Sequence, residues 1–215
     1  MTKAQKSRGM IMSCEGLLVI FCGPSGVGKG TILNIAKERN PKIKYSVSAT
    51  TRSPRQGEKD GESYFFKTVD EFEEMIKNEE LIEWVEYCGN YYGTPKKYVE
   101  EAISDGFDMV LEIEVEGAGN IKKMYPEAVT VFVLPPSFDK LKERLVGRGT
   151  EKIEVIEKRL KRAQQEIMHT ENYEYIIIND DIEKAVESFN SILTAEKAKY
   201  KRNLDIVSQM ISHSK

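Results

Sequence analysis

Residues 23–29 read Gly-Pro-Ser-Gly-Val-Gly-Lys and stand between a short apolar run and a helical pattern. The run, Leu17 to Cys22, is partly β-branched and ends at glycine, which is typical of a strand buried on both faces. After the loop, apolar residues from Ile32 to Ala36 recur at helical spacing until Pro41 ends the helix. A strand, a glycine-rich loop and a helix in this order predict a phosphate-binding loop.

Each part of this loop suits negative charge. Glycines let backbone N–H groups turn inward around phosphate oxygens, and the following helix adds its positive end. Lys29 can reach the β- and γ-phosphates of a nucleotide. The position that usually carries a Mg²⁺-binding hydroxyl is Gly30, with Thr31 one step later, so Mg²⁺ could rest mainly on nucleotide phosphates and water. An ordinary glycine-rich turn is the alternative, which three glycines and a lysine in this context disfavour.

The same alternation of strand and helix continues along the chain. Apolar runs predict strands at Met109–Val115, Val129–Leu134 and Tyr175–Ile178, each followed by a helical pattern. After Thr150, apolar residues recur at spacings of 3 and 4 over 153–167, and a closing helix is expected from Ile182 to about Tyr200. The alternation predicts an α/β fold, a parallel sheet flanked by helices, with its ligand crevice at the carboxyl ends of the strands.

A middle block departs from this alternation. A helix is expected after an N-cap at Asp70, and short strands at 81–87 and 90–93. This block predicts a lobe of mixed strands and helix inserted into the sheet.

Charge and cysteine usage exclude several classes of protein. The net charge is 32 − 35 = −3, so we expect no nucleic-acid partner and only a local basic site. The longest apolar run has six residues, against about 20 for a membrane span, so no membrane partner is expected. Cys14, Cys22 and Cys88 form no CxxC pair, and three unpaired cysteines suit the reducing cytoplasm.

Several further motifs indicate which class of nucleotide-binding protein carries this phosphate loop. The chain has no Asn-Lys-x-Asp tetrapeptide of the kind that reads guanine in switch GTPases. Residues 48–58 read Ser-Ala-Thr-Thr-Arg-Ser-Pro-Arg-Gln-Gly-Glu, residues 82–84 Ile-Glu-Trp, and residues 89–94 Gly-Asn-Tyr-Tyr-Gly-Thr. Gly-Arg-Gly-Thr follows at 147–150 and Asn-Asp-Asp at 179–181. Together with the loop, these motifs resemble guanylate kinases from about residue 16 to 200.

The resemblance implies reversible transfer of the γ-phosphoryl group of ATP to GMP, with Mg²⁺ as cofactor. It implies an ATP site at Gly23, Pro24, Ser25, Gly26, Val27, Gly28, Lys29, Gly30, Thr31, Arg144, Arg148 and Asn179. It implies a GMP site at Ser48, Arg52, Arg55, Glu58, Tyr64, Glu83, Tyr92, Thr94, Glu112 and Glu114. The catalytic residues would be Lys29, Arg52, Arg148 and Arg159, and the metal would lie near Thr31 and Glu112, in part through water.

The chemistry of these residue types agrees with the resemblance. Two guanidinium groups can make bidentate bonds to a phosphate, and tyrosine hydroxyls complete its shell. A carboxylate at Glu83 accepts from N1–H and the 2-amino group of guanine, and Ser48 donates to O6. Adenine presents a donor at position 6, where guanine has an acceptor, and lacks the 2-amino group, so it leaves buried polar groups unpaired. Taken singly, the arginines could be solvated turn residues and the tyrosines core aromatics.

An acidic run carries a further expectation. Glu112, Glu114 and Glu116 alternate with apolar residues, which predicts three carboxylates on one face of a buried strand, opening onto cations or ligand. An edge strand with a solvated acidic face is the alternative. The family commonly has aspartate at the first two positions and glutamine at the third.

Two other residues have alternative interpretations. Asn179 could simply belong to a helix-capping turn. Arg162, a weaker lid candidate, could pair with Glu166 on the helix surface.

The domain division follows the resemblance. We expect an N-terminal tail at 1–13, one domain at 14–205 and a C-terminal tail at 206–215. Within the domain, the core would comprise 14–47, 95–137 and 170–205, with a GMP-binding lobe at 48–94 and a helical lid at 138–169. Monomer and homodimer both stay open. Two rival functions remain: a non-catalytic interaction domain of the same family, and a related kinase with another phosphate acceptor.

Overall fold

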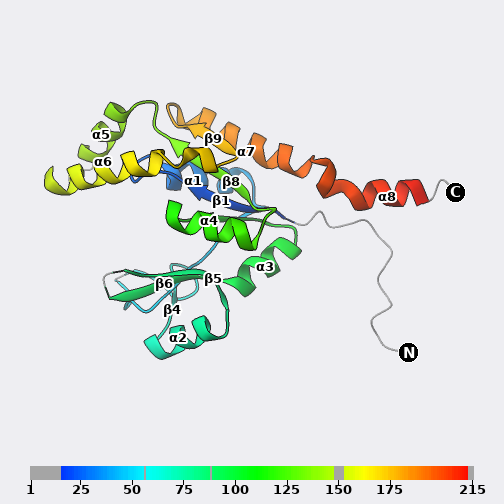
Figure 1. The fold of residues 1–215 in the computed structure, drawn as a ribbon, viewed down its shortest axis with the longest axis horizontal. Coiled ribbons are helices and arrows are strands. Elements are labelled where there is room, and N and C mark those ends of the chain that lie inside the picture. The colour runs from blue at the N-terminus through cyan, green and yellow to red at the C-terminus, as the bar shows by residue number, and fades with distance from the viewer. Residues whose placement is uncertain (1–15, 56, 88, 148–152, 213–215) are drawn as a thin grey trace.

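The computed structural model describes residues 16–55, 57–87, 89–147 and 153–212. Its core is a five-stranded parallel sheet in the order β2-β7-β1-β8-β9. The strands are β1 (Leu18–Cys22), β2 (Ile43–Tyr45), β7 (Asp108–Glu112), β8 (Val129–Leu134) and β9 (Tyr175–Ile178). The predicted parallel α/β sheet is confirmed, and β1 lies at its centre (Figure 1).

Alternate residues of β1 face two separate layers of helices, as the two-residue period of a strand requires. Val19 and Phe21 pack with α1 (Lys29–Arg39) and α7 (Ile182–Lys197) in one apolar cluster. Leu18 and Ile20 pack on the other face with α3 (Lys96–Ser104) and α4 (Val115–Met124). The sheet is therefore buried on both sides, which places its ligand site at its carboxyl edge.

The middle block forms a separate four-stranded sheet, in the order β4-β3-β6-β5. Its elements are β3 (Ala49–Thr50), β4 (Phe65–Phe66), α2 (Val69–Lys77), β5 (Leu81–Tyr87) and β6 (Asn90–Pro95). In Figure 1 this lobe lies below the core. The expected N-cap at Asp70 is wrong: Thr68 caps α2, accepting from the amide of Glu71, whose carboxylate accepts in turn from the amide of Thr68. That reciprocal pair satisfies two helix-end donors, which Asp70 inside the first turn cannot do.

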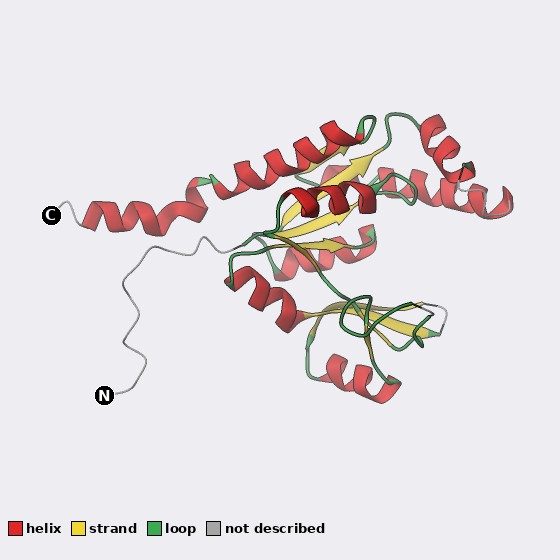
Figure 2. Cartoon of the chain, turned by 180° about the vertical axis from the view of Figure 1, so that it is seen from behind, coloured by secondary structure: helices red, strands yellow, loops and turns green. Residues whose placement is uncertain are grey.

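The segment expected to form the lid, which keeps that name below, contains α5 (Phe138–Val146) and α6 (Ile153–Ile167). The two helices pack through the small apolar cluster of Leu141, Leu145, Ile156 and Ala163. The lid lies above the lobe in Figure 1, and both project from the same side of the core, as the view from behind also shows (Figure 2).

The chain closes with η1 (Thr170–Asn172), η2 (Tyr200–Asn203) and α8 (Leu204–Ser212). Residues 206–212 were expected in a tail but lie in α8, which has apolar residues at helical spacing and extends from the body (Figure 1). Among the residues that the structure describes, no helix is both long and apolar enough to cross a bilayer.

The acidic run does not lie on one strand face, so that expectation is wrong. β7 ends at Glu112, whose partner on β1 is Phe21, the last registered pair between these strands. Glu114 is the N-cap of α4, and Glu116 lies inside that helix. In the part of the chain that the structure describes, no strand pairs with the residues after Glu112, so the alternating pattern continues into a turn and a helix instead of a sheet.

Candidate active site

The phosphate loop leaves the carboxyl end of β1 and closes onto the first turn of α1. Gly23 has φ of 148°, and a Cβ there would lie 2.5 Å from the carbonyl oxygen of Val133. Gly28, the N-cap of α1, has φ of 97°, and a Cβ there would lie 2.5 Å from Nδ2 of Asn179. Both positions therefore need glycine, because a side chain would be strained and would collide. The loop brings backbone amides and the positive end of α1 together, as anion binding requires.

Lys29 places its ammonium group over the start of the loop. Its Nζ donates to the carbonyl oxygen of Gly23 at 2.6 Å and lies 3.7 Å from Oε1 of Glu112 at the end of β7. The side chain is mostly buried, whereas Glu112 is about half exposed. The structure thus brings a cation and a carboxylate together at the carboxyl edge of the sheet.

The described side chains offer few ligands for a metal ion at this edge of the sheet. Within the described ranges, no three His, Cys, Asp or Glu side chains gather to hold a metal. Mg²⁺ commonly takes one or two protein carboxylates and completes its shell with phosphates and water. Glu112 beside Lys29, with Thr31 exposed in the first turn of α1, fits that arrangement.

The lid contacts the phosphate loop directly. Nη1 of Arg159 donates to Oγ of Ser25 at 3.3 Å. Arg144 donates to the carbonyl oxygen of Val27 at 3.3 Å and to that of Asn179 at 2.8 Å. Arg148, expected in the same group, lies outside the described residues.

Asn179 holds the loop rather than a helix end. Its Nδ2 donates to the carbonyl oxygen of Val27 at 2.7 Å, and the residue is buried. Asp181 caps α7 instead, accepting from the amide of Lys184 at 3.1 Å. The capping interpretation of Asn179 is therefore wrong. The contact with Val27 was not foreseen, because 152 residues separate the partners.

The residues expected to bind the acceptor phosphate gather on the lobe. Nη2 of Arg52 donates to both carboxylate oxygens of Glu58, at 2.9 and 3.0 Å, and the amide of Arg55 donates to Oε2 of Glu58 at 2.7 Å. Cζ of Arg52 lies 5.4 Å from the ring centre of Tyr64, which packs edge-to-face with Tyr92 at 6.2 Å. The hydrogen bond to Glu58 raises the pKa of Arg52, and the same bond lowers the pKa of Glu58. Both groups stay charged, so an anion here would meet a guanidinium already held in place.

A small cavity of about 170 Å³ is lined by residues of α1, β2, β6 and β7 and by the segments that follow β2 and β7. Ser48, Thr94 and Glu112 line it, together with Asn34 and Tyr45, which the sequence did not single out. The hydroxyl of Tyr45 is buried and has no hydrogen-bond partner among the described residues. Burial raises its pKa, so it stays protonated and can donate to a ligand.

Glu83 stands on β5 directly opposite Thr94 on β6, and Oγ1 of Thr94 donates to Oε1 of Glu83 at 2.8 Å. Burial raises the pKa of Glu83 above its ordinary value, and the bond from Thr94 opposes that shift in part. The lobe therefore presents an oriented carboxylate that is partly shielded from water.

Glu114 lies apart from these groups, exposed at the start of α4, where its carboxylate pairs with Nη2 of Arg162. Nε of Arg162 also donates to Oε1 of Glu166 at 3.1 Å. The expected surface pair of Arg162 and Glu166 is thus present, with a second partner that was not foreseen.

Comparisons with known proteins identify the family. The sequence profile of the family described as Guanylate kinase matches residues 15–196. The chain is 50% identical to a guanylate kinase of Halalkalibacterium halodurans over 92% of this chain and 97% of that protein. It is 53% identical to one of Carboxydothermus hydrogenoformans over 87% of this chain and 92% of that protein. The crystal structure of guanylate kinase from Anaplasma phagocytophilum superposes with a TM-score of 0.70 at 36% identity, covering 90% of this chain and 93% of that one.

Proposed function

Because the chain belongs to the guanylate kinase family and is an enzyme that phosphorylates GMP at the expense of ATP, we propose that its two anion sites divide these substrates. The phosphate loop and the lid would hold ATP, and the lobe would hold GMP. The division rests on where the cations lie: Lys29 is on the loop, and Arg52 and Arg55 are on the lobe.

On the ATP side, loop amides and Lys29 bind the triphosphate, while Arg159 reaches over Ser25 from the lid. Arg144 and Asn179 hold the backbone of the loop in its binding shape. The Mg²⁺ that accompanies ATP neutralises phosphate oxygens when bound, and Glu112 would hold it through water with Thr31 nearby. Arg148 is proposed as a further lid cation on the motif alone.

On the GMP side, Arg52, Arg55, Tyr64 and Tyr92 bind the acceptor phosphate, and Glu58 keeps Arg52 in position. Glu83 and Ser48 read the guanine edge, with Thr94 orienting the carboxylate. Glu112 and Glu114 are placed near GMP by the family resemblance. Of these two, only Glu112 lines the small cavity.

The reaction needs no protein nucleophile. A phosphate oxygen of GMP attacks the γ-phosphorus in line, the bond to the β-phosphate oxygen breaks, and ADP and GDP result. Lys29, Arg52 and the lid arginines stabilise the charge on the transferring group, and closure of the lobe and the lid excludes water. The chain therefore contributes position and charge.

Two properties complete the proposal. The reducing cytoplasm is the proposed compartment, on the ground of cysteines without a pairing pattern. The complete phosphate loop and curated relatives at about 50% identity favour an enzyme over a non-catalytic interaction domain.

A coupled ADP-release assay with GMP, AMP, UMP and CMP side by side tests the substrate assignment. We expect rapid ADP release with GMP alone among the four. Equal release with all four, or release that needs none of them, would refute the proposed acceptor site.

A further inference from the structure

Two of the three lid arginines that the structure describes contact the phosphate loop, and the third contacts a different part of the core. Arg144 donates to the carbonyl oxygens of Val27 in the loop and of Asn179 after β9, and Arg159 donates to Oγ of Ser25 in the loop. Arg162, three residues after Arg159 on α6, binds Glu114 at the start of α4 instead. Arg162 thus joins the lid to a segment that the ATP site does not use.

The guanidinium of Arg162 is held from its own helix. Its Nε donates to Oε1 of Glu166 at 3.1 Å, and the Glu166 side chain is only 16% exposed. A planar guanidinium fixed at Nε has its remaining nitrogens aimed in one direction. Here Nη2 meets the carboxylate of Glu114, so the ion pair has a defined geometry although it lies at the surface.

Glu114 belongs to the same helical turn that lies against the base-reading carboxylate. It is the N-cap of α4, and its carbonyl oxygen accepts from the amide of Gly117 at 3.0 Å. A Cβ at Gly117 would lie 3.9 Å from Oε2 of Glu83. Ile113, the residue before Glu114, lines the small cavity with Ser48. A base bound at Glu83 would therefore rest close to this turn and restrict its movement.

We propose that the Arg162–Glu114 pair couples occupation of the GMP pocket to closure of the lid, with Arg162 as a positioning residue. This inference rests on the proposed assignment of GMP to the lobe. A base that orders the first turn of α4 fixes the position of Glu114, and Glu114 in turn holds Arg162. Because Arg162 and Arg159 lie on the same helix, α6, this contact also keeps Arg159 over Ser25. Binding of ATP and binding of GMP then favour each other by the same factor, as thermodynamic linkage requires.

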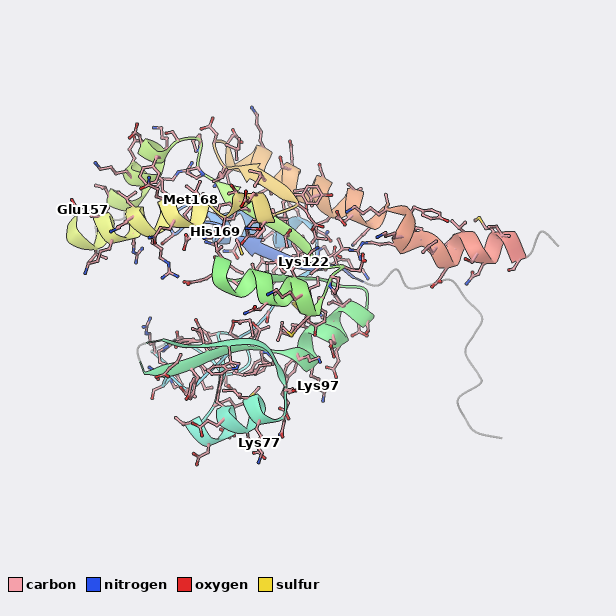
Figure 3. All side chains as sticks on the ribbon, in the orientation of Figure 1. Lys77, Lys97, Lys122, Glu157, Met168 and His169 are labelled. Carbon is pink, nitrogen blue, oxygen red and sulfur yellow. The ribbon has the colours of Figure 1, made fainter. Side chains whose placement is uncertain are left out.

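The groove between α4 and α6 supplies a matched control. Lys158 and Lys161 line it from the lid beside Arg162, and Lys122 lines it from α4. Figure 3 shows Lys122 on α4 and His169 just beyond the end of α6. No ion pair of Lys158 is found among the described residues. Lys158→Gln therefore removes one positive charge from the same groove without touching the Arg162–Glu114 pair.

The test is calorimetric titration of GMP with and without a non-hydrolysable ATP analogue and Mg²⁺. It compares the wild type, Arg162→Gln, Glu114→Gln, the double variant and Lys158→Gln. The coupling is the GMP dissociation constant without the ATP analogue divided by the constant with it. We expect each single variant to lower that ratio by about two- to fivefold, the range of an exposed ion pair, and the double variant to lower it no further. Lys158→Gln should keep the wild-type ratio.

Other outcomes would overturn the inference. The inference fails if the wild type shows no coupling, or if the single variants keep the wild-type ratio. It also fails if Lys158→Gln lowers the ratio as much as they do. A purely structural role would lower the unfolding temperature of the variants and leave the ratio unchanged. If Arg162→Gln does not fold, Glu114→Gln carries the same test. GMP-dependent ADP release by the same wild-type sample distinguishes a failed coupling from a failed substrate assignment.

Discussion

The hydroxyl of Thr94 donates to Oε1 of Glu83 at 2.8 Å across the paired strands β5 and β6. The bond occupies one carboxylate oxygen and leaves Oε2 facing the first turn of α4. Burial disfavours the charge on Glu83, and the Thr94 bond recovers part of that cost. Under the proposed assignment, this oriented carboxylate would accept from the N1–H and 2-amino donors of guanine.

Glu83→Gln should weaken the preference for guanine. The amide keeps the shape of the side chain but presents donors where guanine also has donors, so GMP leaves polar groups unpaired at about 1–3 kcal/mol. We expect the ratio of kcat/KM for GMP over AMP to fall roughly ten- to hundredfold. Glu86→Gln, an exposed change on the same strand, serves as the control. An unchanged ratio in Glu83→Gln would reject Glu83 as the base reader.

The raised pKa of Glu83 makes GMP binding depend on pH. As the pH falls through that pKa, the carboxylate gains a proton and loses an acceptor, so GMP affinity should fall. The effect on stability has the opposite sign. The folded protein holds this proton more tightly than the unfolded chain, so the Glu83 contribution to stability rises as the pH falls through the same window.

Titrating the GMP dissociation constant against pH in the wild type and in Glu83→Gln tests this dependence. The GMP phosphate also titrates near pH 6, but it does so equally in both proteins. Glu58 stays ionised through the window, because the bond from Arg52 lowers its pKa. Parallel pH profiles for the two proteins would contradict the prediction.

Local patterns predicted much of the fold. The strands at Val129–Leu134 and Tyr175–Ile178 match β8 and β9 residue for residue, because each apolar run ends at a proline or asparagine that interrupts it. The expected strand from Met109 continued too far, since the alternation beyond Glu112 could not show that the partner strand had ended. Strand length here depends on pairing, which lies outside the local sequence.

In the candidate site, too, local motifs could be predicted from the sequence and tertiary contacts could not. The phosphate loop is local and follows from a short motif, whereas the bond between Arg52 and Glu58 was not predicted although only six residues separate them. The bond from Asn179 to Val27 spans 152 residues, so only the folded chain shows that Asn179 supports the loop. Sequence patterns identified residue types suited to the chemistry, and tertiary contacts distinguish residues that can touch a nucleotide from those that position others.

Lys29→Ala should abolish turnover and leave the fold intact. Among the described residues, Lys29 donates to the carbonyl oxygen of Gly23 and lies beside Glu112, outside the apolar core clusters, so its loss creates no cavity there. Removing one preorganised charge from the transferring phosphate should lower kcat by about 10²–10³ or more. ADP release and circular dichroism measure the two effects, with Lys77→Ala on the outer helix α2 as control (Figure 3). Near-normal GMP phosphorylation by Lys29→Ala would remove it from the mechanism.

Asn179→Asp should weaken ATP binding and spare GMP binding. The change replaces the amide donor to the Val27 carbonyl with a second acceptor, so the loop loses its support and meets repulsion. We expect the dissociation constant for the ATP analogue to rise by about tenfold or more, in line with about 1–3 kcal/mol for a lost buried bond. Asn172→Asp, an exposed change on η1, is the matched control. Equal weakening of GMP binding would indicate a general loss of structure instead.

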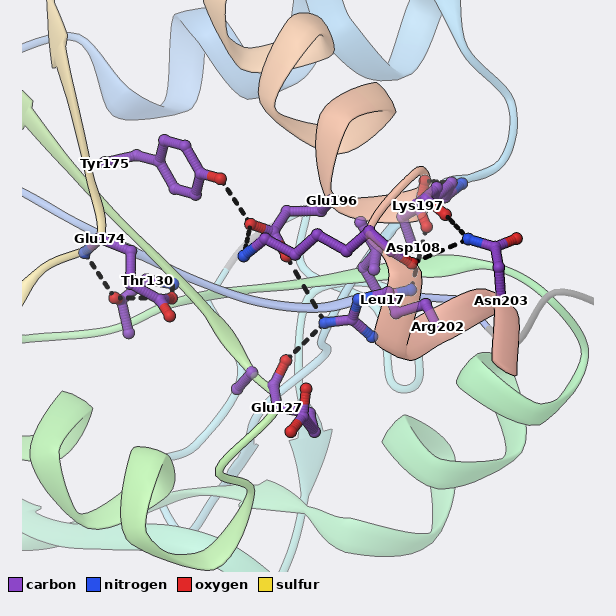
Figure 4. A network of polar contacts seen from close by, with 12 residues as sticks. Leu17, Asp108, Glu127, Thr130, Glu174, Tyr175, Glu196, Lys197, Arg202 and Asn203 are labelled. Atoms are coloured by element: carbon purple, nitrogen blue, oxygen red, sulfur yellow. Dashed lines mark hydrogen bonds and ion pairs between the residues drawn. The ribbon is translucent and has the colours of Figure 1, made fainter. Parts of the chain in front are cut away.

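Asp108→Asn should lower the free energy of unfolding and leave the catalytic rate unchanged. Asp108 is fully buried at the start of β7, where Oδ1 accepts from the amide of Leu17 at 3.0 Å and Oδ2 from Nζ of Lys197 at 2.6 Å (Figure 4). Asparagine can keep the first bond but leaves Lys197 without its counter-charge. Lys197 is about one-third exposed, so water compensates in part. The loss should be about 1–3 kcal/mol, less than for a wholly buried pair.

Catalysis should not change, because the pair lies at the far end of the strand from the nucleotide site. β7 has five residues, so about 13 Å separates Asp108 from Glu112 beside Lys29. Urea unfolding and the GMP-dependent ADP-release rate, measured on Asp108→Asn and on the exposed control Asp105→Asn, test both halves of the prediction. A fall in kcat at a temperature where Asp108→Asn remains folded would show that the two ends of the sheet are coupled, and would refute the separation.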